Sequence, residues 1–61
     1  MTKHTEYRIV ETSTVTDDNL TDILNEETAK GWTFDGINFV ANESSKRPKM
    51  AFVVFTREVV A

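Results

Sequence analysis

Few residues of this chain could carry out a reaction, and they are not placed as a reactive set. Enzyme sites need a nucleophile with a base, two convergent carboxylates or a metal. Glu26 and Glu27 are adjacent, so on a helix their side chains point about 100° apart and do not face one substrate. Ser44 and Ser45 have no histidine or lysine placed as a base. We therefore expect a protein that is not an enzyme, with both glutamates on a solvated helix surface.

The sequence also argues against a bound metal or cofactor. His4 is the only histidine and lies in a polar N-terminal stretch, while the chain has no cysteine. A structural zinc site draws several ligands from these two residue types. We expect His4 to be an exposed tail residue and no cofactor to be bound, so stability must come from packing and from self-association.

One group of charges could contact a partner. Lys46, Arg47 and Lys49 surround Pro48 and form the only basic cluster. They are compatible with contact to an acidic protein or to a phosphate backbone. The nearby Phe52 and Phe55 would suit an aromatic platform for nucleic acid. The formal net charge of −3 works against nucleic-acid binding, and a solvated hairpin loop is the alternative interpretation.

A helix over about 17–30 is predicted to position these groups. The residues at 16–19 are Thr, Asp, Asp and Asn, which cap free N–H groups and suit the positive end of the helix dipole. Apolar residues then recur at helical spacing, namely Leu20, Ile23 and Leu24. Glu27 stands where this stripe would continue. We expect it at the edge of the buried face, with its carboxylate in water.

The helix end is predicted to be a structural anchor made by Gly31 and Trp32. Glycine can adopt the left-handed conformation that ends a helix, and Lys30 before it suits the negative end of the dipole. The indole ring of Trp32 can then cover the helix end and seal the core. Contact of Trp32 with a ligand or partner is the alternative.

Three strands are predicted around this helix, over about 6–14, 32–40 and 49–59, with a loop at 41–48. In the second strand the apolar alternation changes parity near Gly36, which indicates either a β-bulge or a strand buried on both faces. One domain over 1–61 is therefore expected. It has the α+β order strand, helix, strand, strand, with a three-stranded antiparallel sheet and the helix packed on one face.

The last strand is apolar on both faces and predicts self-association. Met50, Phe52 and Val54 lie on one side of it, opposite Ala51, Val53 and Phe55. One helix covers only one face of the sheet, and soluble monomers rarely leave a large apolar face exposed. We expect a homodimer or larger symmetric oligomer, with a self-association face made by Val10, Met50, Phe52 and Val54. Val10 is interchangeable here with the pair Tyr7 and Ile9, and a monomer with a terminal tail folded over the face is the alternative.

The expected compartment is the cytoplasm. The first six residues are polar and lack the apolar core of a signal peptide. The longest apolar run, from Met50 to Phe55, is six residues long, whereas a membrane-spanning helix needs roughly 20. We expect a soluble protein with no membrane contact.

Several short motifs resemble the bacterial family called domain of unknown function 4177. They are Leu24-Asn25-Glu26, then Gly31-Trp32, then a strand ending Thr56-Arg57-Glu58. Thr33 stands where a glutamate is typical of that family, and Glu27 where an apolar residue is usual. The resemblance implies a short single-domain protein with the same βαββ order, and it implies no activity.

Together these features predict a small non-catalytic module, of bacterial or phage type, that oligomerises and acts by contacting a partner protein. The partner would meet either the hairpin loop or the acidic helix face. The alternative is a nucleic-acid-associated regulator that uses the paired basic loops of a dimer. That alternative needs Lys46, Arg47 and Lys49 of both subunits on one surface, free of the acids at 17, 18 and 22.

Overall fold

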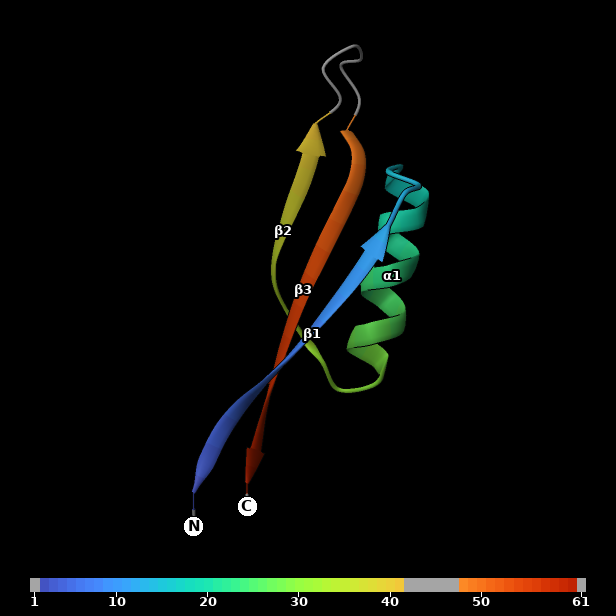
Figure 1. Cartoon of the computed structure of the whole chain (residues 1–61). Coiled ribbons are helices and arrows are strands. Elements are labelled where there is room, and N and C mark those ends of the chain that lie inside the picture. The colour runs from blue at the N-terminus through green and yellow to red at the C-terminus, as the bar shows by residue number, and fades with distance from the viewer. Residues whose placement is uncertain (1, 42–47, 61) are drawn as a thin grey trace.

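The protein is an α+β domain with the element order that the sequence predicts. A computed structural model describes residues 2–41 and 48–60. Its elements are β1 (Lys3–Thr12), α1 (Asp17–Ala29), β2 (Thr33–Ala41) and β3 (Pro48–Val60). Figure 1 shows one helix beside a twisted antiparallel sheet of three strands. The predicted fold class is confirmed.

The central strand of the sheet is β3. It pairs antiparallel with β1 on one side and with β2 on the other, giving the order β1-β3-β2. A central strand has neighbours on both edges, which suits the one segment that is apolar on both faces. The strand richest in apolar residues therefore takes the central position.

The pairing register divides the sheet into a face toward the helix and an open face. On the helix side Val53 lies opposite Val10, and Phe55 lies opposite Arg8. Ala51, Val53 and Phe55 are 0%, 1% and 0% exposed and are the buried apolar core. The predicted helix stripe, Leu20, Ile23 and Leu24, is half-buried. The core is thus one alternate row of β3 under the apolar stripe of α1.

A bulge in β2 confirms the first of the two interpretations of the parity change. Phe34 lies opposite Phe55, the register shifts by one residue before Gly36, and Ile37 then lies opposite Val53. Because the extra residue restores parity, Phe34 and Ile37 lie on the same face. The rings of Phe34 and Phe55 meet edge to face at 6.3 Å between centroids.

Both ends of α1 are built as the sequence predicts. The Thr16 hydroxyl accepts the backbone N–H of Asn19 at 3.2 Å. At the other end Gly31 has φ 98°. The backbone N–H of Gly31 donates to the carbonyl of Thr28, and that of Trp32 to the carbonyl of Glu27, both at 3.1 Å. This pair of bonds is the Schellman arrangement, which satisfies carbonyls left free at a helix end.

The first strand differs from its predicted bounds of 6–14. It begins at Lys3, opposite Val60, so His4 is an exposed strand residue and not a tail residue. The long third strand supplies backbone partners to this polar stretch, which has no apolar pattern of its own. The strand ends at Thr12, whose hydroxyl accepts the backbone N–H of Thr14 at 3.1 Å. That side-chain bond turns the chain away from the sheet.

The molecule is elongated. Figure 1 shows β1 and β3 continuing past the start of β2 as a two-stranded ribbon that ends near both termini. The Cα radius of gyration is 13.8 Å, against about 10–11 Å for a compact domain of this length. Within residues 2–41 and 48–60, no helix combines the length and the apolar character that a membrane crossing requires.

Candidate functional site

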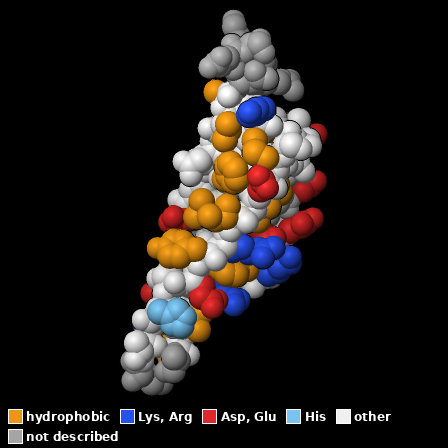
Figure 2. All heavy atoms as spheres, viewed as in Figure 1, with side chains coloured by type: hydrophobic (Ala, Val, Ile, Leu, Met, Phe, Trp, Pro, Cys, Tyr) orange, Lys and Arg blue, Asp and Glu red, His pale blue; other side chains and the backbone are white. Residues whose placement is uncertain are grey.

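The first candidate surface is the open face of the sheet, on the side away from α1. It is defined here by six apolar side chains: Tyr7, Ile9, Val40, Met50, Phe52 and Val54. Tyr7 and Ile9 on β1 are 68% and 63% exposed. The three residues of the central strand are half-buried, because side chains of both neighbouring strands flank them. Figure 2 shows hydrophobic side chains following the strands across the visible surface.

The prediction is wrong for one member of this face. Val10 lies opposite Val53, on the side covered by the helix, and not with Met50, Phe52 and Val54. Successive side chains of a strand alternate between faces, so the pair Tyr7 and Ile9 takes the place assigned to Val10. The three residues of β3 do share the open face, as predicted.

Charge is divided between the two faces. Among the described residues where all three strands pair, Glu11 is the one charged residue that lies opposite a β3 residue of the open face. The helix side carries Arg8, Glu27, Lys30 and Arg57. Figure 2 shows acidic and basic side chains gathered beside the hydrophobic band. The open face is therefore apolar and nearly free of charge, which is the composition typical of a surface that another molecule covers.

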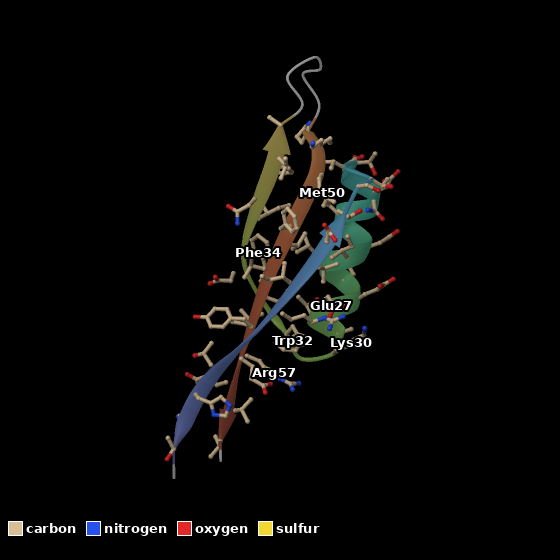
Figure 3. The ribbon with its side chains drawn as sticks, viewed as in Figure 1. Glu27, Lys30, Trp32, Phe34, Met50 and Arg57 are labelled. Atoms are coloured by element: carbon tan, nitrogen blue, oxygen red, sulfur yellow. The ribbon has the colours of Figure 1, made fainter. Side chains whose placement is uncertain are left out.

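A second candidate region lies at the C-terminal end of α1, where Figure 3 shows Glu27, Lys30, Trp32 and Arg57 close together. The Arg8 Nε donates to Glu27 Oε1 at 2.6 Å, and Lys30 Nζ lies 3.5 Å from Glu27 Oε2. Glu27 is only 4% exposed. The predictions that place its carboxylate in water are wrong, because β1 brings Arg8 across the helix end and pairs the charge inside.

The ring of Trp32 is held by a cation from the sheet. The Arg57 guanidinium lies 4.5 Å from the ring centroid, and Arg57 Nε also donates to Glu6 Oε1 at 2.8 Å. Stacking of a guanidinium on an indole is favourable. These contacts join β1 and β3 to Trp32, three residues beyond the end of α1. The anchor role of Gly31 and Trp32 stays a prediction.

The contacts at the C-terminal end of α1 form a structural joint, which here means a set of ion pairs and a ring contact that fasten the helix end to the sheet. Its cations are already engaged by Glu27, Glu6 and the indole. Sequence reasoning missed the joint, although one signal was present: Glu27 continues the apolar stripe of the helix at helical spacing. An acid in that position needs a basic partner from a neighbouring element.

The basic cluster is only partly visible. Lys46 and Arg47 lie outside the described residues, while Lys49 is an exposed residue of β3. The acids Asp17 and Asp18 occupy the first turn of α1. The nucleic-acid alternative stays a prediction from the sequence.

The described part of the chain shows no other site. In residues 2–41 and 48–60 no group of three or more potential metal ligands occurs, and no pocket is found. A scan against protein-family models, a search of curated proteins and a search of solved structures each found no match. The fold defines the chain as a small βαββ protein, and its resemblance to the family named above stays a prediction.

Proposed function

We propose that the protein is a small, non-catalytic interaction module of the cytoplasm that associates with a second copy of itself through the open face. The observation that carries this proposal is an imbalance between buried and exposed apolar residues. In the described part of the chain three apolar residues are buried, whereas Tyr7, Ile9 and Val40 of the open face are each at least 36% exposed. An apolar face next to so small a core is stabilised when a copy covers it.

The geometry of the face suits a symmetric contact. A sheet can pack against an identical sheet at about 10 Å, with the two mean strand directions within about 30°. A two-fold axis through the face brings the same residues together from both copies, and the near absence of charge leaves little repulsion at their meeting. Helix α1 and its acidic residues then remain outside, where they are free to contact a partner protein.

The total surface supports the same proposal. The accessible surface is 4632 Å² for a chain of 7.0 kDa, against about 4,000 Å² for a monomeric protein of that mass. An elongated shape and an uncovered sheet face both raise the accessible surface. Covering the open face in a dimer would lower the accessible surface of each chain toward the value expected for a protein of this mass.

The test is the solution mass by light scattering across a concentration series. We expect a dimer or a larger even-numbered assembly for the natural sequence. Ile9→Glu puts a charge on the open face, on an edge-strand side chain that is 63% exposed. It should therefore spare the fold and move the association to at least tenfold higher concentration, because the charge would be desolvated in the contact.

The matched control is Asn25→Glu, which adds the same charge to an exposed position of α1. It should leave the mass unchanged, with the circular dichroism of both variants equal to that of the natural protein. A natural protein that is monomeric at all concentrations would refute the proposal. A mass that Ile9→Glu leaves unaltered would refute the assignment to this face.

A further inference from the structure

The two edges of the sheet are built differently. An edge strand offers unpaired backbone N–H and C=O groups to any other strand, and proteins usually protect such edges with charged side chains. Strand β1 carries charges along its length: Lys3, Glu6, Arg8 and Glu11. Strand β2 has no charged residue from Gly36 to Ala41. One edge is protected against pairing and the other is not.

Exposed apolar side chains gather along the unprotected edge. Phe39 lies opposite Ala51, so it is on the helix side of the sheet. Ala51 is 0% exposed, but Phe39 is 50% exposed and Phe34 is 46% exposed. The helix side of the central strand is therefore buried, whereas these two rings of the outer strand stay about half exposed. Among residues 2–41 and 48–60, no helix or strand lies beside the outer edge of β2 (Figure 1).

We propose that this edge pairs antiparallel with β2 of a second copy, about a two-fold axis at Asn38. Strands that pair this way place Ile37 opposite Phe39 of the second copy and Gly36 opposite Val40 of the second copy. Opposed residues of an antiparallel pair share a face, so Ile37 and the exposed Phe39 ring meet on the helix side. Asp35, at the bulge, then faces Ala41 and meets no like charge.

A second copy fits this edge because the segment is complementary to itself. Like charges opposite each other destabilise a strand pair, and a segment without charge has none to oppose. The area of the open face gives a second reason. Three strands about 4.8 Å apart, over the seven paired residues from Met50 to Thr56, give a patch of about 300 Å² in projection. The accessible surface of such a patch is larger than its projection, but the patch is small beside interfaces that bury about 800 Å² of accessible surface per partner. A contact along the edge would add buried surface to it.

Edge pairing does not depend on the face-to-face contact between two open faces. When both contacts form, the assembly is larger than a dimer. A two-fold axis perpendicular to the sheet joins two three-stranded sheets with both helices on the same side. The two open faces become neighbours in one larger apolar surface. When two such surfaces pack together, the assembly contains four copies with two kinds of contact.

A single cysteine tests the edge, since the natural chain has none. Asn38 is exposed, and directly opposed residues of paired strands have Cα atoms about 4.5–5.5 Å apart, within the range that a disulfide bridges. Under mild oxidation Asn38→Cys should form a covalent dimer at least tenfold faster than Glu11→Cys. Glu11 is a matched control because it is exposed on the same face of the other edge strand.

The same cysteine in the Ile9→Glu background separates the two contacts. Ile9→Glu weakens the face-to-face contact, in which the sheets lie about 10 Å apart, so rapid disulfide formation at Asn38 in this background requires the edge contact. Rapid cross-linking that survives Ile9→Glu supports edge pairing whatever becomes of the open face. Cross-linking of Asn38→Cys no faster than Glu11→Cys overturns edge pairing, and the light-scattering mass then decides separately whether the open face still associates.

Discussion

At the scale of single residues, the buried acid of α1 is the feature most dependent on its surroundings. Glu27 is 4% exposed and pairs with Arg8 from β1 and Lys30 from its own helix. A buried charge is tolerated only where hydrogen bonds and opposite charges replace water. The contact with Arg8 fastens the helix to an edge strand, whereas that with Lys30 is long and exposed and contributes little.

Glu27→Ala should lower the free energy of unfolding by about 1–3 kcal/mol, because it removes a buried partner of Arg8. The half-exposed guanidinium can still reach water, so a larger loss is not expected. Glu26→Ala is the control, since its neighbouring side chain is exposed and should change stability by less than about 0.5 kcal/mol. Urea denaturation of both variants measures the difference. Equal losses would contradict the role given to Glu27.

The two glycines of the chain should respond differently to alanine. Gly31 has φ 98° with open space around the position of a Cβ, so Gly31→Ala costs about 1–2 kcal/mol through backbone strain alone. Gly36 has open space and no positive φ. Gly36→Ala should leave stability unchanged or raise it by up to about 1 kcal/mol. Thermal unfolding of the two variants compares them directly.

At the scale of elements, each segment forms from local signals and is placed by the central strand. The helix begins at a polar cap and ends at a glycine, and β3 forms because its residues alternate between two apolar rows. One row packs under α1 and the other forms the middle of the open face. The helix is only 13 residues long, so its stability depends on this packing and on its caps.

Thr16→Ala should lower the free energy of unfolding by about 1 kcal/mol, because the hydroxyl satisfies the N–H of Asn19 at the start of α1. Thr21→Ala is the matched control. Thr21 is exposed within the same helix, where alanine is at least as favourable. Chemical denaturation of the pair should show a loss for Thr16→Ala only. A loss of the same size in both would show that the cap is not the cause.

At the scale of the whole molecule, stability should depend on protein concentration. Association that requires the folded state stabilises it by mass action. For the natural sequence we expect the midpoint of thermal unfolding to rise as the concentration increases. The Ile9→Glu variant should lose the part of this dependence that comes from the open face and keep only the part that edge pairing of β2 contributes. A midpoint that is independent of concentration for the natural protein would contradict both association proposals.

The sequence by itself determined the element order, the helix caps and the two apolar rows of β3, and it left open whether the parity change near Gly36 was a bulge. These features follow from spacing and backbone preferences within a few residues. Only the tertiary structure decided which β1 side chains lie on the open face and which lie under the helix. Neighbouring residues such as Ile9 and Val10 point to opposite faces, and the pairing register with β3 places Ile9 on the open face and Val10 on the helix side. The burial of Glu27 against Arg8 was also visible only in the tertiary structure. The two residues are 19 positions apart, and a local sequence pattern does not predict a contact between distant segments.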